Sequence, residues 1–239
     1  MRWAVLSLVL FCKLTMAQTV EDIKSQGGNT AGTKVDYTVT GIPIPVGKYI
    51  GVVNGSPYFS ENWMISTIVL TDGSVFNNIP VKIDLASKKL LFKDSLGREL
   101  IATSPASEVS FVNPSTAIQY RFMHSSAPGF PGDAAAPGWY LVLAAGKVSL
   151  YNKIEKEINE TTPYGSATSE QNIITKNHYL LQKDSSLTTI KKLKDIIALL
   201  PDQKSRLINY VHAQKLSDKR EADLAKLVAY YNSLVTKQP

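Results

Sequence analysis

Cysteine is nearly missing from this sequence, since Cys12 is the only one among 239 residues. It lies within residues 1–17, where Arg2, an apolar run over residues 3–11 and small residues up to Ala17 form the pattern of a secretory signal peptide. The sequence therefore predicts export to the periplasm or cell envelope, with cleavage after Ala17. The mature chain would contain no disulfide and no cysteine-based metal site, so its stability has to come from a packed core.

Long apolar runs are missing as well. An uncleaved membrane anchor is the alternative to a signal peptide, but Lys13 interrupts the first apolar run well short of the roughly 20 residues that a spanning helix needs. We therefore expect no transmembrane helix in the mature chain. The remaining length is sufficient to bury a core in one large domain or two small ones.

Recognisable catalytic motifs are also missing. The sequence has no G-x-S-x-G nucleophile elbow and no glycine-rich loop that would bind a phosphate or a dinucleotide. The three histidines, His124, His178 and His212, stand too far apart in the sequence to form a zinc-binding pair on one helix face. We therefore predict no catalytic residue, no cofactor and no metal ligand.

Positive charge is concentrated towards the C-terminal end. From Lys183 onward the chain has eleven Lys and Arg residues against six Asp and Glu residues, whereas residues 18–182 have thirteen against fourteen. Because the acidic residues are interspersed with the lysines, the pattern favours a solvated helical surface, and we expect no nucleic-acid partner. Binding of nucleic acid or anionic lipid is the alternative, and it requires the basic side chains to converge on one patch. Those side chains are Lys191, Lys192, Lys194, Lys204 and Arg206.

Alternating apolar and polar residues over residues 35–190 predict an antiparallel β domain. Residues 55–94 show the pattern best, with one strand over residues 64–70, a tight turn and a returning strand over residues 75–85. Pro80 within the returning strand indicates an edge position or a bulge, because proline has no N–H to donate to a neighbouring strand. Further short strands follow about ten residues apart, which is typical of an antiparallel meander.

The segments outside this alternation are assigned differently. Residues 18–34 predict a mobile leader, with a short helix over residues 20–25 as the alternative. Residues 125–138 contain too many prolines and glycines for a strand and predict a long exposed loop. Over residues 153–160 the isoleucine spacing fits both a strand and a helix, and we favour a continuing strand. Residues 161–172 predict a polar loop.

Helical periodicity begins near the C-terminus, over residues 191–239. Pro201 is expected to end one helix and to suit the first turn of the next. Asp218 and Glu221 have the spacing of a capping box at the start of the last helix. That helix carries an apolar stripe made of Leu224, Leu227, Val228, Tyr231, Leu234 and Val235.

Aromatic side chains near the start of the meander form the predicted binding surface. Tyr58, Phe59 and Trp63 lie close together in the sequence and would offer a stacking platform for sugars, although aromatic residues on strands also fill cores. Phe130 is expected at the tip of the loop over residues 125–138, where it would contact a partner or a membrane. These four residues are the candidate binding residues.

Several short motifs also occur in combination. They are Gly55-Ser56-Pro57-Tyr58, Asp72-Gly73, Leu90-x-Phe92-Lys93, Gly138-Trp139-Tyr140, Gly146-Lys147-Val148-x-Leu150, Tyr179-Leu180 and a terminal Tyr230-Tyr231-Asn232-x-Leu234. The combination, which covers residues 55–234, resembles a family of exported β-rich proteins of Bacteroidetes-type bacteria. The resemblance implies an envelope location and a β-rich fold with C-terminal helices, and it supplies no activity and no catalytic residues.

Together these features predict an α+β protein, in which an antiparallel β-meander curved into a half-barrel or roll packs against C-terminal helices. The favoured function is that of a non-catalytic envelope protein that binds a partner protein or an extracellular polymer such as a polysaccharide. The alternative is a hydrolase that acts on an envelope polymer through a carboxylate pair, because such a pair needs no sequence motif. The sequence does not predict an oligomeric state.

Overall fold

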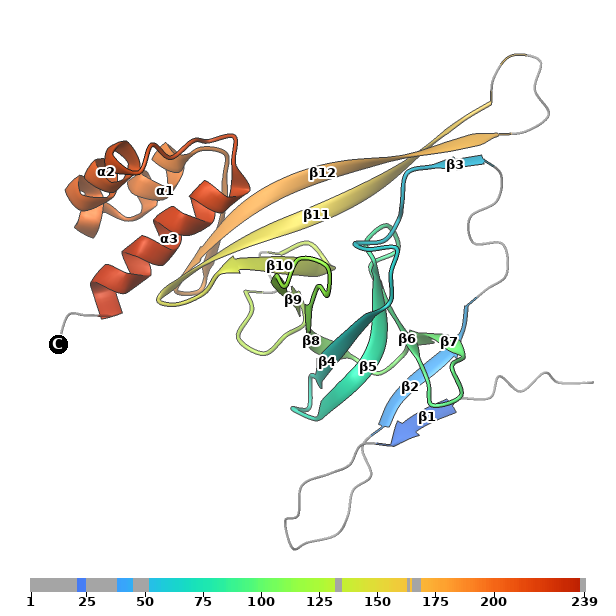
Figure 1. Ribbon diagram of the computed structural model, residues 1–239. Helices are drawn as coiled ribbons and strands as arrows, with labels where there is room; N and C mark the ends of the chain where they lie inside the picture. Colours follow the sequence, from blue (N-terminus) through green and yellow to red (C-terminus); the bar gives the residue numbers. More distant parts are fainter. Residues whose placement is uncertain are drawn as a thin grey trace, which may run out of the picture.

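The computed structural model describes residues 21–24, 38–44, 52–131, 135–162, 164 and 169–236. Within these residues the chain forms one 13-stranded sheet, and helices follow it at the C-terminal end (Figure 1). The coarse prediction of an antiparallel β protein with C-terminal helices is therefore confirmed. The predicted signal peptide and most of the predicted leader lie outside the described residues.

All of the described strands precede the helical elements in the chain. The strands are β1 (Glu21–Lys24), β2 (Thr38–Pro43), β3 (Val52–Asn54), β4 (Met64–Leu70), β5 (Val75–Asp84), β6 (Lys89–Lys93), β7 (Glu99–Ala102), β8 (Ala106–Val112), β9 (Gln119–His124), β10 (Trp139–Ala144), β11 (Val148–Thr161), β12 (Glu170–Lys183) and β13 (Ser186–Ile190). The helical elements are α1 (Leu193–Leu199), the 3-10 helix η2 (Pro201–Gln203), α2 (Lys204–Ala213) and α3 (Glu221–Thr236). Among these described helices, none is long and apolar enough to cross a membrane.

The strands are ordered β1-β2-β7-β6-β5-β4-β8-β9-β10-β11-β12-β13 in the sheet, and β3 adds to β12 in parallel. Residues 21–24 form a strand that pairs with β2, so the alternative of a short helix over residues 20–25 is wrong. Pro43 pairs with Leu100 of β7, while β1 on the other side of β2 reaches only as far as Gly41. The missing N–H of this proline therefore costs no hydrogen bond to β1.

Strand β5 contains the irregularity that Pro80 suggested. Ser66 of β4 pairs with Ile79, but Ile68 pairs with Phe76, so β5 has one extra residue between these two pairs. Asn78 lies in this bulge and adopts a positive φ of 61°. Pairing of β5 with β6 begins only after Pro80, which explains why a proline is tolerated there.

Strands β11 and β12 form a long two-stranded ribbon, and each strand has 14 residues (Figure 1). The favoured strand over residues 153–160 is therefore confirmed, whereas the predicted loop over residues 161–172 is too long, because β12 already begins at Glu170. Residues 174–178 of β12 are exposed, and they show no apolar alternation. Exposed residues need no such alternation, so the sequence pattern misses this part of β12.

Three apolar clusters cover one face of the sheet and part of the other. The first, which we call the meander core, lies on one face of β2 and of β4 to β10, and includes Val39, Ile68, Val81, Phe92, Val109, Phe122 and Leu141. The helix core joins Leu150, Leu181 and Ile190 to Leu193, Leu207, Leu224 and Leu227 of the helices. The loop core is formed by Ala127, Phe130, Tyr140 and Tyr151. Because Val142 and Tyr151 form one cross-strand pair and Leu141 and Asn152 the next, the loop core lies on the opposite face of β10 and β11.

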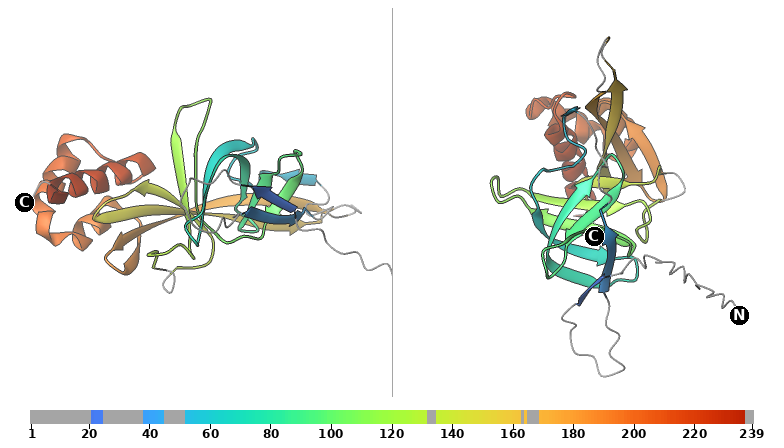
Figure 2. Two further views of the ribbon diagram at one scale, coloured as in Figure 1. Left: turned by 90° about the horizontal axis from the view of Figure 1, so that it is seen from below. Right: turned by 90° about the vertical axis from the view of Figure 1, so that its right-hand side faces the viewer.

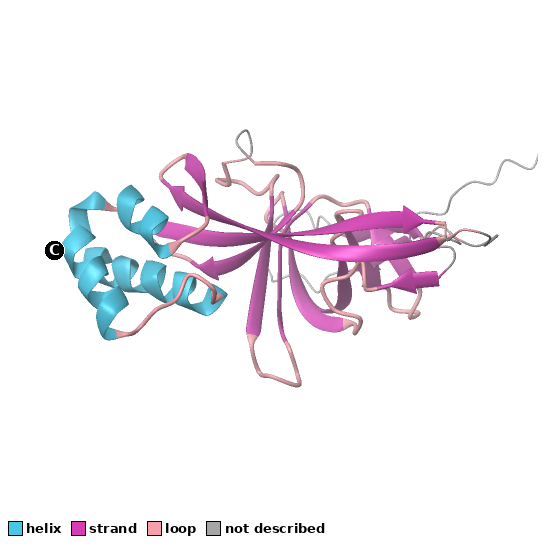
Figure 3. Cartoon of the chain, turned by 90° about the horizontal axis from the view of Figure 1, so that it is seen from above, coloured by secondary structure: helices cyan, strands magenta, loops and turns pink. Residues whose placement is uncertain are grey.

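The helices gather at one end of the molecule, and the ribbon runs away from them (Figures 2 and 3). Asn232 of α3 forms the polar contact at this end: its Oδ1 accepts a hydrogen bond from the N–H of Val148 at 3.0 Å, and its Nδ2 donates to the carbonyl of Val148 at 2.8 Å. A Cβ atom on Gly146 would lie 2.6 Å from Asn232 Cγ. Glycine is therefore required at position 146 for the helix to approach this closely.

The predicted capping box of the last helix is wrong. Helix α3 begins at Glu221, so Glu221 is not its third residue, and its carboxylate accepts a hydrogen bond of 2.6 Å from Asn152 on β11. Asp218 accepts a hydrogen bond of 2.6 Å from the N–H of Leu193 at the start of α1. Each of these acidic side chains therefore accepts a hydrogen bond from a different element, Asp218 from α1 and Glu221 from β11.

We predict that Asn232→Ala lowers the free energy of unfolding by about 2 to 4 kcal/mol, because it leaves the buried N–H and carbonyl of Val148 without partners. Chemical denaturation measures this change. The matched control is Ser233→Ala on the exposed side of the same helix, which should change the stability by less than about 0.5 kcal/mol. Equal stabilities of the two variants would contradict the role assigned to Asn232.

Candidate functional site

The segment that carries Tyr58 and Phe59 runs alongside the end of β5. The N–H of Phe59 donates to the carbonyl of Ile83 at 2.9 Å, the N–H of Leu85 donates to the carbonyl of Pro57 at 2.9 Å, and Tyr58 forms an antiparallel bridge with Asp84. Neighbouring residues of an extended segment point to opposite faces. Tyr58 and Phe59 are therefore separated by the sheet, although they are adjacent in the sequence.

Phe59 points into the meander core. Its ring centroid lies 4.8 Å from that of Phe122 and 5.0 Å from that of Tyr120, both in edge-to-face geometry, and 6.0 Å from that of Phe111. These contacts are typical of a packed aromatic cluster. Phe59 therefore does not share a surface with Tyr58 and Trp63, and its predicted place in the binding surface is corrected to a core position.

Tyr58 and Trp63 come together on the opposite face of the sheet, around two lysines. The ammonium of Lys82 lies 4.8 Å from the ring centroid of Tyr58 and 5.1 Å from that of Trp63, and the ammonium of Lys93 lies 4.8 Å from the Trp63 centroid. All four side chains are partly exposed. We call Tyr58, Trp63, Lys82 and Lys93 the Trp63 surface.

The two lysines of the Trp63 surface differ in their charge partners. Lys93 forms an ion pair of 3.3 Å with Glu99, whereas no carboxylate among the described residues pairs with Lys82. A cation–π contact positions an ammonium group without neutralising its charge. Lys82 is therefore held in place between two rings, with its N–H donors available to a ligand.

Carboxylates lie close to the Tyr58 phenol. Burial, and then the charges of Asp84, Glu61 and Glu99, raise the pKa of Tyr58 above its ordinary value. The phenol therefore keeps its proton at neutral pH and is able both to donate and to accept a hydrogen bond. Asp84 is fully buried, and its Oδ1 accepts a hydrogen bond of 2.9 Å from the N–H of Ser87, so it is not presented to solvent.

Apolar side chains continue this face beyond Trp63. Ile65 of β4 pairs with Pro80 of β5, and the pairing of Ser66 with Phe111 places Ile65 beside Val112 of β8. Ile65 is 59% exposed and Val112 is 53% exposed. Pro80, Ile65 and Val112, which we call the apolar row, therefore lie side by side on a face that remains open to water in the described chain.

Phe130 is buried instead of exposed, which corrects its predicted place at a loop tip. It is only 7% exposed, and its ring centroid lies 4.9 Å from that of Tyr140 and 5.1 Å from that of Tyr151. The loop folds back on the sheet because its ends are joined: the N–H of Ser125 donates to the carbonyl of Gly138 at 2.9 Å. The described residues of this loop therefore form part of the loop core.

We predict that Phe130→Ala lowers the free energy of unfolding by about 3 to 5 kcal/mol, because it leaves a cavity between Tyr140 and Tyr151. Thermal and chemical denaturation measure the loss. Leu96→Ala is the matched control, since Leu96 is 74% exposed and its truncation should be nearly neutral. An unchanged stability of the Phe130 variant would contradict the burial of this ring.

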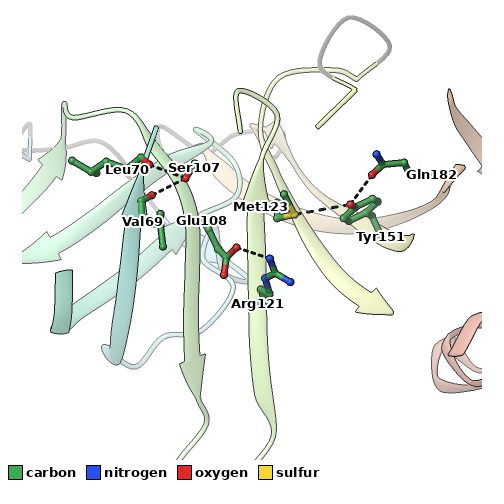
Figure 4. A network of polar contacts seen from close by, with 8 residues as sticks. All are labelled: Val69, Leu70, Ser107, Glu108, Arg121, Met123, Tyr151 and Gln182. Atoms are coloured by element: carbon green, nitrogen blue, oxygen red, sulfur yellow. Dashed lines mark hydrogen bonds and ion pairs between the residues drawn. The ribbon is translucent and has the colours of Figure 1, made fainter. Parts of the chain in front are cut away.

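Several polar side chains of the neighbouring strands already have hydrogen-bond partners within the chain (Figure 4). Arg121 donates to Glu108 at 2.7 Å, and this hydrogen bond raises the pKa of Arg121. Tyr151 donates to Gln182 at 2.8 Å, and Ser107 donates to backbone carbonyls of β4. These groups join adjacent strands to one another, and their geometry supports a structural role.

The histidines do not come together. His124 shares a hydrogen bond of 2.7 Å with Ser126 two residues further on, and burial lowers the pKa of His124. His178 lies 3.1 Å from Glu155, which also forms an ion pair of 2.7 Å with Lys153. Within the described ranges, no group of three or more His, Cys, Asp or Glu residues has the arrangement of a metal site.

The loop core has a measurable consequence at high pH. Burial raises the pKa of Tyr140 to about 12, from an ordinary value of 10.0. Between these two values the unfolded chain has lost the Tyr140 proton while the folded chain keeps it, so stability falls as the pH rises. We predict that Tyr140→Phe, compared with the parent protein, loses less stability between pH 9.5 and 11.5 in chemical denaturation. Parallel losses in both proteins would contradict the burial of this phenol.

Comparisons of the chain with protein-family models, with curated proteins and with solved structures give no match. The assignment of the site therefore depends on its geometry. Sequence reasoning identified Tyr58 and Trp63 but missed Lys82 and Lys93. The outward positions of these lysines on β5 and β6 were a usable signal, but their distance from Trp63 depends on strand register, which the sequence alone did not supply.

Proposed function

We propose that the protein is an exported, non-catalytic envelope protein that binds an extracellular polymer through the Trp63 surface. The observation that carries the proposal is the clustering of two partly exposed aromatic rings around lysines that the rings position. Tryptophan and tyrosine are enriched among the residues that contribute most to binding, because they provide large contact areas with few rotatable bonds.

The chemistry of the Trp63 surface suits carbohydrate. Aromatic rings stack on the C–H faces of sugars, and hydroxyl groups need nearby donors and acceptors. The ammonium of Lys82 supplies donors, and the Glu99 carboxylate, which is paired with Lys93, supplies acceptors. We therefore favour a polysaccharide over a protein as the bound polymer.

Hydrolysis of that polymer is the second candidate, and the carboxyl groups give it less support. A general acid needs a carboxyl group with a raised pKa. In Asp72, Asp195 and Asp223, hydrogen bonds from backbone N–H groups lower the pKa, and in Glu155 a hydrogen bond from Lys153 does so. These carboxylates are held ionised in structural contacts.

The proposal also includes an envelope location, curvature of the sheet and docking of the C-terminal helices. The signal-peptide pattern of residues 1–17 and the resemblance to exported proteins of Bacteroidetes-type bacteria support an envelope location. The shared meander core supports curvature of the sheet into a half-barrel or roll, since a flat sheet would leave that face in water. The helix core supports docking of the C-terminal helices on the last strands of this sheet.

We predict that Trp63→Ala weakens binding to the retained polymer by about tenfold or more, because it removes the central ring of the surface. Affinity electrophoresis through gels that contain single polysaccharides measures the effect, and a pull-down from the envelope fraction detects a protein partner instead. Trp63 is partly exposed, so circular dichroism should show an intact fold.

Tyr164→Ala is the matched control, because Tyr164 is a fully exposed aromatic residue between β11 and β12, outside the Trp63 surface. It should bind as the parent protein does. Equal retention of the Trp63 variant and the parent would place binding elsewhere. Failure of the parent protein to be retained by any polysaccharide would refute the proposed function.

A further inference from the structure

Charges of both signs surround the Trp63 surface. They include the ammoniums of Lys82 and Lys93 and the carboxylates of Glu61 and Glu99, while Asp84 is fully buried. Glu61 and Glu99 are near enough to raise the pKa of Tyr58, so they lie within the electrostatic reach of the surface. Lys156 in turn lies within electrostatic reach of Glu61. The surface therefore presents carboxylates as well as ammonium groups to a ligand.

This mixture of charges distinguishes between two classes of polysaccharide. A chain with a carboxylate or sulfate on each sugar would meet Glu61 and Glu99 as well as the lysines, so repulsion would offset part of the attraction. A neutral chain meets no such repulsion, and its hydroxyl groups use ammonium donors and carboxylate acceptors equally. The charge pattern therefore matches a neutral chain and disfavours an acidic one.

The apolar row extends the surface in one direction. Lys93 lies on β6, Lys82 on β5, and Trp63 immediately before β4; Ile65 on β4 and Val112 on β8 continue across the neighbouring strands. Four adjacent strands span about 14 Å at a spacing of roughly 4.8 Å. Weakly polar C–H faces of further sugars would cover Ile65 and Val112, which a single sugar at Trp63 would leave in water.

We propose that the ligand of this face is a neutral, linear polysaccharide that lies across β6, β5, β4 and β8, with sugars on both the Trp63 surface and the apolar row. The proposal rests on the proposed function, because it takes the Trp63 surface as the binding site. It adds that the ligand is uncharged and that the polysaccharide runs across the four strands.

The test uses pairs of polymers that share a backbone but differ in charge. Affinity electrophoresis of the full mature chain would compare hydroxyethylcellulose with carboxymethylcellulose, dextran with dextran sulfate, and methyl-esterified with free-acid homogalacturonan. We expect retention by a neutral member of a pair, with an affinity that changes by less than about twofold between roughly 20 and 500 mM NaCl, because screening acts on charge attraction.

Two sets of variants separate charge from shape. Lys82→Gln keeps hydrogen-bond donors but removes the charge, so it should weaken binding of the neutral polymer by no more than about threefold, whereas a charge-driven site would lose about tenfold or more. The double variant Ile65→Ser with Val112→Ser should weaken polymer binding by about fivefold or more and leave binding of a disaccharide from the same polymer unchanged. Lys204→Gln, on the exposed side of α2, is the matched lysine control.

The outcomes distinguish the two proposals. Retention by acidic members only, with an affinity that falls steeply with salt, would overturn the neutral-ligand inference and leave the proposed function standing. An unchanged affinity of the double serine variant would overturn the inference that the polysaccharide extends across β8. Lack of retention of the parent protein by every member of the three pairs would count against both proposals.

Discussion

The stability of this molecule depends on removing one face of a 13-stranded sheet from water. Its predicted mature chain has no disulfide that would provide stability by other means. The same face is covered in two ways. Along β2 and β4 to β10 its apolar residues form the meander core, and those of β11 to β13 belong to the helix core. Phe130, in the described part of the loop that follows β9, covers part of the other face.

The junction between the two covers is polar. Asn152 on β11 donates to Asn177 on β12 and to Glu221 at the start of α3, and Asn232 at the other end of α3 pairs with the backbone of Val148. Apolar contacts alone would allow α3 to slide along the strands. Hydrogen bonds at both ends of the helix give it one position, because each bond that a slide broke would leave a buried polar group unpaired.

The uncovered part of the outer face is where binding is proposed. Strand alternation presents Tyr58, Trp63 and Ile65 on this face, while Phe59 and Met64 enter the core. Alternate residues of the same strands therefore have two roles. One set is buried and stabilises the fold, and the other set forms the face where binding is proposed. The lysines add donors to this surface, and their placement over aromatic rings leaves Lys82 unpaired with any described carboxylate.

The sequence by itself determined the strands of the meander, the strand over residues 153–160 and the helical C-terminus, because these elements carry periodic apolar residues that report a buried side. Tyr58 and Trp63 were also recognisable as candidates. Only the tertiary structure decided that Phe59 packs against the meander core and that Phe130 is buried. It also decided that Asp218 and Glu221 join separate elements, and that Lys82 and Lys93 meet Trp63. These outcomes depend on strand register and on contacts between distant segments, which local patterns do not specify.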